Sequence, residues 1–263
     1  MTAPADGAAH DLPADVWRTA TGRRKPWLVV ALRPCGRLLF RGAFRLTVRG
    51  TENVPTSGAV LLAGNHTGFL DGPLVWAFSP RSATFLAKSE LFVGPLARAL
   101  GWLGQVPVHR GRPDRTALRT ALGVLGDGGA MGVFPEGTRG AGVLESVSDG
   151  LGWLALKSQV PVVPIAVLGT AEAMPRGERP RLRAPVTLAF GPPVTLTTTG
   201  DPRARRTVRA AAEELRLALL RHLEASSQGD FASSTAARPE AGTGLPTGVR
   251  TDAGLPAVQE KDA

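Results

Sequence analysis

Cysteine is almost absent from this sequence, since Cys35 is the only one among 263 residues. A single cysteine excludes an internal disulfide framework and a metal site built from several cysteines, and it is typical of a reducing compartment. The four histidines are scattered and lack the HxxxH-type spacing of zinc sites, so no metal site is expected. No uninterrupted apolar run reaches the roughly 20 residues that a helix needs to cross a bilayer.

The sequence also lacks the motifs of several common enzyme classes. No G-x-S-x-G occurs, which argues against a serine hydrolase, and no Walker A sequence occurs, which argues against a P-loop nucleotide site. The glycines at 126–129 precede an expected strand instead of following one, so they do not fit a dinucleotide-binding fingerprint. The functional residues must therefore belong to another kind of site.

The charge is strongly basic and belongs to the first part of the chain. Lysine and arginine number 31 against 22 acidic residues, a formal net charge of +9. Residues 226–263 hold five acidic and three basic residues, a net of −2, so residues 1–225 carry +11. This charge predicts an anionic partner, which would be a lipid surface, a phosphorylated substrate or nucleic acid. The excess of arginine over lysine is typical of a GC-rich bacterial genome.

A basic nucleic-acid-binding protein is the main alternative outside the enzymes. The arginine clusters at 176–183 and 203–209 favour it. The absence of tyrosine, the small number of aromatic residues and the lack of a recognition motif argue against it. We therefore expect no nucleic-acid partner.

Composition divides the chain into four segments. Residues 1–22 are polar and predict a flexible leader without the basic start of a secretory signal. Residues 23–48 combine apolar runs with arginines, interrupted at Arg33-Pro34, and predict short amphipathic helices in a membrane interface. The alternative is a helical hairpin packed on the domain. Residues 49–225 form the expected domain, and 226–263 have the composition of a disordered tail.

Short apolar runs alternate with amphipathic segments in residues 49–225. Strands are expected at 47–50, 59–63, 83–87, 104–108, 130–134, 160–167 and 186–190. Two prolines restrict the strand at 160–167 to an edge or an irregular position. The pattern predicts an α/β fold, a single domain with a mixed, partly parallel sheet flanked by helices, plus an N-terminal membrane-interface helical segment. Ligands of such sheets gather beyond the carboxyl ends of the strands.

A histidine and a carboxylate lie close together after the buried strand at 59–63. His66 and Asp71 would point to different faces of one ideal helix, but Gly68 permits a bend and Gly72-Pro73 is typical of a helix start. The carboxylate of Asp71 can then accept from the imidazole and leave the other ring nitrogen free to act as a general base. The alternative is that Asp71 only caps the helix and His66 fills a loop.

A second group of polar residues follows the strands at 104–108 and 130–134. Glu136 to Gly140 offers glycine backbone N–H groups, the hydroxyl of Thr138 and the guanidinium of Arg139, a set that suits a phosphate, and Arg110 would be a second clamp. The alternative is a structural salt bridge of Glu136 with one of these arginines. His109, at a strand end, is expected to be incidental.

Four sequence blocks occur in the order found in one known family and cover roughly residues 50–195. They are N-H-x-x-x-x-D (Asn65 to Asp71), V-H-R (108–110), F-P-E-G-T-R (134–139) and V-P-V-V-P (160–164). Together they resemble the 1-acylglycerol-3-phosphate O-acyltransferase family, also called lysophosphatidate acyltransferases. In its second block the family usually has an acidic residue where this chain has His109, and many members carry a lysine after the F-P-E-G-T-R block where residues 147–150 have none. These departures bear on the acceptor more than on the reaction type.

The resemblance implies an enzyme that transfers a fatty acyl group from acyl-CoA or acyl-carrier protein to the free hydroxyl of a lysophospholipid. The expected acceptor is 1-acylglycerol-3-phosphate, giving phosphatidate, and the alternative is another lysophospholipid or a glycolipid. It also implies direct attack on the thioester without an acyl-enzyme, a metal or a cofactor, at the cytoplasmic face of the cell membrane, with the protein bound peripherally or monotopically to an anionic surface. The implied catalytic residues are His66 and Asp71, and the implied substrate-binding residues are Asn65, Arg110, Glu136, Gly137, Thr138 and Arg139.

Overall fold

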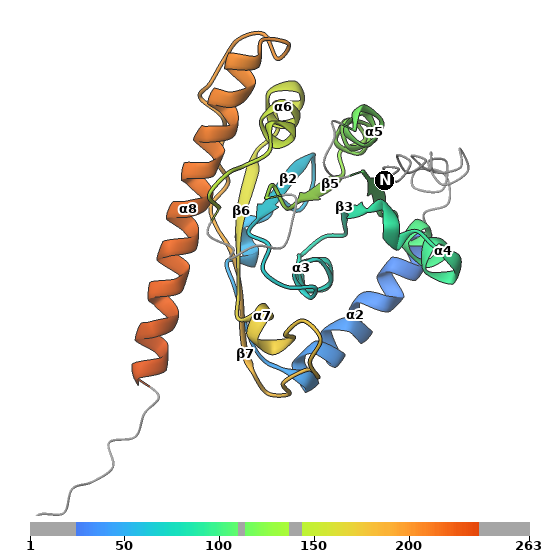
Figure 1. The fold of residues 1–263 in the computed structure, drawn as a ribbon, viewed down its shortest axis with the longest axis vertical. Coiled ribbons are helices and arrows are strands. Elements are labelled where there is room, and N and C mark those ends of the chain that lie inside the picture. The colour runs from blue at the N-terminus through green and yellow to red at the C-terminus, as the bar shows by residue number, and fades with distance from the viewer. Residues whose placement is uncertain (1–24, 110–113, 137–143, 237–263) are drawn as a thin grey trace, which may run out of the picture.

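One sheet of seven strands forms the centre of the molecule (Figure 1). The computed structural model describes residues 25–109, 114–136 and 144–236. In this part of the chain the strand order is β1-β7-β6-β2-β5-β3-β4, and only the β6–β7 pair is antiparallel. The strands are β1 (Arg45–Arg49), β2 (Val60–Gly64), β3 (Ala83–Lys88), β4 (Val106–Val108), β5 (Ala130–Val133), β6 (Val162–Leu168) and β7 (Pro185–Phe190). The predicted mixed, partly parallel sheet is confirmed.

Helices cover both faces of the sheet (Figure 1). On one side lie α5 (Arg115–Gly126), α6 (Asp149–Ser158) and α8 (Arg205–Ala236). On the other side lie α2 (Pro26–Ala43), α3 (Asp71–Phe78), α4 (Gly94–Trp102) and the short α7 (Thr170–Ala173). The described chain also contains two 3₁₀ turns, η1 (Thr51–Asn53) and η2 (Ser89–Leu91).

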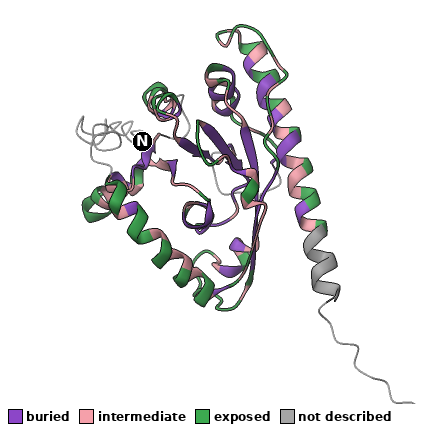
Figure 2. Ribbon diagram, turned by 180° about the vertical axis from the view of Figure 1, so that it is seen from behind, coloured by how far each residue is buried: buried purple, intermediate pink, exposed green. Residues whose placement is uncertain are grey.

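Strand β2 is buried along its whole length and separates two hydrophobic cores. Val60 and Leu62 pack into the core beneath α3, whereas Leu61 and Ala63 pack into the core beneath α5, α6 and α8. A strand covered on both faces has no polar side to show, which explains why its sequence is a continuous apolar run. Asn65, which follows β2, is therefore attached to the end of a strand that is packed on both faces (Figure 2).

The segment expected to form short interrupted helices is one continuous helix, α2, with Pro34 inside it. The neighbouring arginines turn inward, and Arg33 Nε donates to the carbonyl of Trp76 at 3.1 Å while Arg37 Nε donates to that of Ala77 at 2.7 Å. These bonds fasten α2 to the C-terminal end of α3 on both sides of Pro34, which offsets the backbone bond that the proline cannot make. Burial, and secondarily the nearby Arg37, lowers the pKa of Arg33 to about 10.

The outer side of α2 is left with apolar side chains (Figure 2). Trp27, Val30 and Leu38 are 66%, 72% and 77% exposed. Within the described residues, no helix combines the length and the apolar character needed to cross a membrane.

The prolines of β6 predicted an edge or an irregular position, and the edge is wrong, whereas an irregular pairing beside Pro164 is found. Strand β6 lies between β2 and β7 in the middle of the sheet. The ladder with β7 starts only at the Ile165–Phe190 pair, and the carbonyl of Pro164 accepts from the N–H of Gly191 at 2.8 Å, just after β7 ends. A proline is tolerated there because it stands next to the regular ladder on that side, so its missing N–H removes no regular ladder bond.

The boundary expected at residue 226 is also wrong, since α8 continues to Ala236. Leu215 and Leu219 are buried against α6 and the sheet, and Ser226 is still buried near the point where the tail was expected to begin. Residues 226–236 contain no proline, and the next proline in the sequence is Pro239. Proline therefore does not interrupt the helical backbone there.

Glu214 on α8 binds the segment that follows β7. Its carboxylate accepts from the backbone N–H and the hydroxyl of both Thr197 and Thr198, at 2.7–2.9 Å. Burial raises the pKa of Glu214, but these hydrogen bonds outweigh burial and lower the pKa to about 2. Because the ordinary value is 4.5, the ionised group stabilises the fold above about pH 4.5, and this contribution is lost as the pH falls toward 2.

We expect Glu214→Gln to be less stable than the parent protein near neutral pH, with a difference that shrinks as the pH falls from about 5 to about 2. Urea unfolding at several pH values measures the difference. Glu224→Gln, an exposed position on the same helix, is the matched control. A Glu214→Gln difference that stays constant with pH contradicts the assignment.

Candidate functional site

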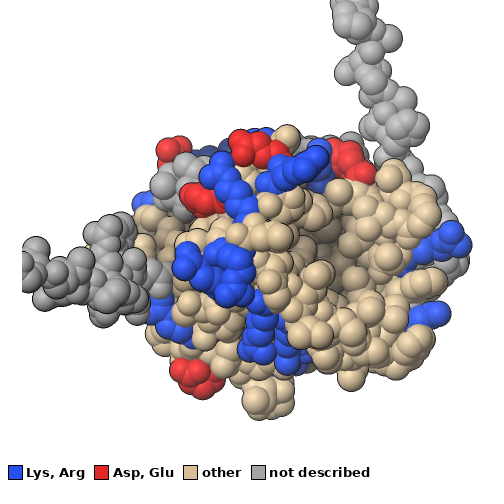
Figure 3. All heavy atoms as spheres, turned by 90° about the horizontal axis from the view of Figure 1, so that it is seen from below, with Lys and Arg blue, Asp and Glu red and all other residues tan. Residues whose placement is uncertain are grey.

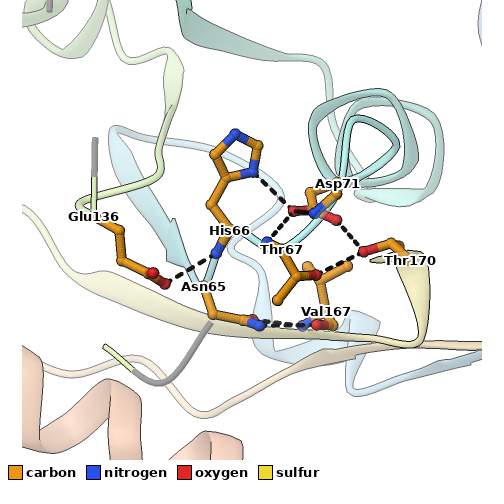
Figure 4. A network of polar contacts seen from close by, with 8 residues as sticks. Asn65, His66, Thr67, Asp71, Glu136, Val167 and Thr170 are labelled. Carbon is orange, nitrogen blue, oxygen red and sulfur yellow. Dashed lines mark hydrogen bonds and ion pairs between the residues drawn. The ribbon is translucent and has the colours of Figure 1, made fainter. Parts of the chain in front are cut away.

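His66 and Asp71 meet in a tight turn between β2 and α3 (Figure 4). Nδ1 of His66 lies 2.8 Å from Oδ2 of Asp71, and the same oxygen accepts from the N–H groups of Thr67 at 2.7 Å and Gly68 at 2.9 Å. Asp71 is 0% exposed and His66 7% exposed. The predicted bend, which turns the first residue of α3 back toward the imidazole, is confirmed.

Thr170 completes the surroundings of Asp71. Its hydroxyl donates to Oδ1 of Asp71 and lies 2.8 Å from the hydroxyl of Thr67. Thr170 is fully buried at the start of α7, and a Cβ at Gly68 would come within 2.9 Å of its hydroxyl, so the turn requires glycine there. Sequence reasoning missed Thr170, although its position directly after the end of β6 was a signal, because His66 follows β2 in the same way.

The carboxylate of Asp71 fixes how the imidazole is used. An ionised carboxylate only accepts hydrogen bonds, so the proton of the His66–Asp71 bond belongs to Nδ1. The remaining ring nitrogen, Nε2, then carries a lone pair, and Figure 4 shows it pointing away from Asp71. The arrangement can remove a proton from a hydroxyl group presented to Nε2.

Glu136 follows β5 and reaches the same edge of the sheet. Its Oε1 accepts from the backbone N–H of His66 at 3.1 Å (Figure 4). Partial burial is the largest influence on this carboxyl group and raises its pKa, and the negative charges of Asp71 and Glu145 act in the same direction. The expectation that the residues after β2 and β5 lie together is therefore confirmed for His66 and Glu136.

Glu136 is the only member of the expected phosphate site among the described residues. Arg110, Gly137, Thr138 and Arg139 lie outside the described residues. His109, which directly precedes Arg110, is paired: its Nδ1 lies 3.1 Å from Oδ2 of Asp114, which also accepts from the His109 N–H at 3.0 Å. His109 thus joins the end of β4 to the N-cap of α5, a structural connection that the sequence did not indicate.

Asn65 was expected to bind substrate, and its contacts correct this expectation. Its Nδ2 donates to the carbonyl of Val167 at 2.9 Å, and its Oδ1 accepts from the Val167 N–H at 2.8 Å. The side chain is buried and joins the end of β2 to β6 like an additional pair of backbone bonds. Asn65 therefore positions the turn that carries His66.

An apolar cavity of about 420 Å³ opens beside His66. Side chains of α2, α3, α4 and β3 line it, and among the lining residues only His66, Trp76, Lys88 and Gln105 carry polar side-chain groups. The ring of Phe134 stacks on the imidazole with centroids 4.6 Å apart, and Phe85 stacks on Phe134 at 5.8 Å. The imidazole thus stands at the wall of a space that suits a hydrocarbon chain.

Comparisons with known proteins agree with this geometry. The model of the family described as Acyltransferase matches residues 45–168. A chloroplastic 1-acyl-sn-glycerol-3-phosphate acyltransferase of Arabidopsis thaliana is 34% identical over 142 residues, which cover 51% of this chain and 39% of that protein. A 1-acyl-sn-glycerol-3-phosphate acyltransferase of Borreliella burgdorferi is 30% identical over 148 residues, 54% of this chain and 58% of that protein. The matched regions span less than two thirds of these two relatives.

A solved structure extends the similarity over most of the chain. The crystal structure of the 1-acyl-sn-glycerophosphate acyltransferase PlsC from Thermotoga maritima matches with a TM-score of 0.58 and 26% sequence identity, covering 86% of this chain and 89% of that one. The region that matches the family model contains His66, Asp71 and Glu136. Residues 45–168 thus resemble the acyltransferase family, and the chain is similar to 1-acyl-sn-glycerol-3-phosphate acyltransferases.

Proposed function

We propose that this protein is an O-acyltransferase that moves a fatty acyl group from an acyl thioester to the free hydroxyl of 1-acylglycerol-3-phosphate, giving phosphatidate. The observation that carries the proposal is the buried His66–Asp71 pair at the wall of an apolar cavity. The names of the relatives support lysophosphatidate as the acceptor. The donor is acyl-CoA or acyl-carrier protein, and the reaction as proposed involves no other cofactor and no metal.

The proposed mechanism is a direct transfer. Nε2 of His66 takes the proton from the acceptor hydroxyl while the hydroxyl oxygen attacks the thioester carbonyl, so that a C–O bond forms and the C–S bond breaks. The thiolate that leaves then takes the proton from the His66 imidazolium. The buried carboxylate of Asp71 holds the ring in place and stabilises its positive charge. A base positioned in this way raises the rate roughly 10²- to 10⁴-fold.

The apolar cavity is the proposed site for a fatty acyl chain. It adjoins the imidazole, and its volume of about 420 Å³ falls within the usual range of small-molecule sites. Its walls include Gly36 on α2 and Leu100 on α4, so these two helices would contact the chain. A chain seated there would have its carboxyl end near Nε2 of His66.

The outer face of α2 supports a location at the membrane. Its exposed Trp27, Val30 and Leu38 form an apolar side on a helix whose Arg33 and Arg37 turn inward, and α2 also lines the cavity. A helix of this kind can lie in the membrane interface. We therefore propose that the protein works at the cytoplasmic face of the cell membrane, bound peripherally or monotopically, where a lysophospholipid would reach the cavity from the bilayer.

Replacing the proposed base tests the reaction. His66→Ala should lower the turnover number about 10²- to 10⁴-fold while the protein stays folded. The measurement uses one labelled acyl thioester with a panel of acceptors: lysophosphatidate, other lysophospholipids and a glycolipid. His222→Ala is the matched control. The imidazole of His222 on α8 contacts the carbonyl of Ala189 on β7 and does not line the cavity. Near-normal turnover of His66→Ala contradicts the base assignment, and a preference for another acceptor corrects the substrate.

Thr170 should act as a positioning residue through Asp71. Thr170→Val keeps the shape but removes the hydroxyl, and we expect about a tenfold lower kcat with little change in KM, since a hydrogen bond to a charged group contributes about 1.5–3 kcal/mol. Thr170→Ser keeps the hydroxyl and should retain most of the parent kcat. Steady-state kinetics of both variants separates the effects, and equal losses in the two variants contradict a role for the hydroxyl.

Narrowing the cavity tests the position of the acyl chain. Gly36→Leu places a larger side chain in the cavity wall, and excluding about two methylenes from an apolar site costs about 1.6 kcal/mol, roughly tenfold. We expect the ratio of kcat/KM for long to short acyl chains to fall by about this factor. Gly42→Leu on the same helix is the matched control, because Gly42 is exposed and open space surrounds it. An unchanged chain-length preference in Gly36→Leu removes the chain from this cavity.

A further inference from the structure

A basic loop joins α7 to β7 and has no role in the site described above. We define the arginine loop as residues 175–183, which hold Arg176, Arg179, Arg181 and Arg183 against Glu178, a net charge of +3. Residues 176–183 are all exposed. Leu182 stands among the arginines and is 72% exposed, an unusual position for a leucine in a charged loop.

Hydrogen bonds hold this loop against the end of α2 and the start of β1. The N–H of Arg183 donates to the carbonyl of Ala43 at 2.6 Å, and Nε of Arg45 donates to the carbonyl of Arg183 at 2.9 Å. The N–H of Arg181 donates to the carbonyl of Ala173 at 2.8 Å. The arginine loop is therefore fixed beside the C-terminal end of the helix with the exposed apolar face.

The face of the molecule seen from below in Figure 1 combines positive charge with uncharged area. Figure 3 shows basic side chains gathered beside a broad, hollowed surface without charged side chains. Glu178 pairs with Arg181 at 3.1 Å, but both side chains are about 60% exposed, so the pair is weak and leaves the loop basic.

We propose that the arginine loop is a second membrane contact that binds the anionic head groups of a lipid surface, while Leu182 enters the interface next to the apolar face of α2. The inference rests on the proposed function, because a lysophospholipid substrate requires a lipid surface. The combination of arginines with an exposed leucine favours lipid, since arginine side chains reach head groups while an apolar neighbour lies deeper. A nucleic acid would be bound by the charges alone and would leave Leu182 without a role.

The position of the loop gives this contact a consequence for the site. Its first residues, together with Met174, line a cavity of about 800 Å³ that the turn of Thr67, Gly68 and Phe69 also lines. That turn carries the backbone groups that bind Asp71. A lipid surface bound by the arginine loop would therefore lie beside the turn that holds His66.

Vesicle binding by the full chain tests the proposal. We expect Arg179→Gln/Arg181→Gln to lower the partition coefficient on vesicles that contain phosphatidylglycerol about 30-fold, since each arginine near such a surface contributes about 1 kcal/mol. Binding to phosphatidylcholine vesicles should not change, and about 1 M salt should remove the difference because it screens the charges. Leu182→Ser should weaken binding severalfold on both kinds of vesicle. Arg205→Gln/Arg206→Gln is the matched control, with the same loss of charge at exposed positions where α8 begins, at the other end of the molecule (Figure 1).

Two results overturn the inference. One is equal vesicle binding by Arg179→Gln/Arg181→Gln and the control; the other is a loss of binding to an acidic acyl-carrier protein or to DNA without any loss on vesicles. Acyl transfer to a short-chain, water-soluble acceptor is measured in the same variants and should stay at the parent level. If the parent protein transfers no acyl group but the vesicle pattern holds, the proposed function fails and the lipid contact stands. Transfer without charge-dependent binding overturns the lipid contact alone.

Discussion

The site depends on one buried negative charge. A carboxylate removed from water is costly unless hydrogen bonds replace its hydration. Asp71 meets this requirement with the imidazole of His66, the N–H groups of Thr67 and Gly68, and the hydroxyl of Thr170. These donors come from the start of the turn after β2 and from the start of α7, so satisfying the charge also fixes where the imidazole stands.

Two neighbours of the turn restrict it further, each from a different strand. Asn65 binds the backbone of Val167 in β6, and Glu136 after β5 accepts from the backbone of His66. Because β5, β2 and β6 are adjacent and parallel, their carboxyl ends bring these groups together without any long connection. The imidazole of His66 is thus attached to the sheet through three strands, and its position does not rely on the loop alone.

Much of this arrangement could be predicted from the sequence, because it follows from local rules. The apolar run of β2 predicted a buried strand, and Gly68 with Gly72-Pro73 predicted the bend that joins His66 to Asp71. The parallel strands then predicted that Glu136 would lie at the same edge. The position of β6 could not be predicted this way, because the rule that confines prolines to edges assumes an uninterrupted ladder, and here the partner strand ends beside Pro164.

The remaining differences arise from contacts between distant parts of the chain. The arginines of α2 were expected beside a membrane surface, yet Arg33 and Arg37 donate to carbonyls at the end of α3. In the same way Asn65 was expected to bind substrate, whereas its side-chain amide forms hydrogen bonds with the backbone of Val167, 102 residues away. Periodicity reports which side of an element is apolar, but it does not report which distant polar groups need a partner.

The bonds from α2 to α3 have a mechanical consequence. Helix α3 begins at Asp71, and Arg33 and Arg37 bind its other end, so hydrogen bonds link α2 through α3 to the turn that carries His66. Tilting α2 would break charged hydrogen bonds at the far end of α3. These hydrogen bonds therefore fix the angle between the apolar side of α2 and the cavity entrance beside His66. A lipid layer that contacts α2 would meet this entrance in one orientation.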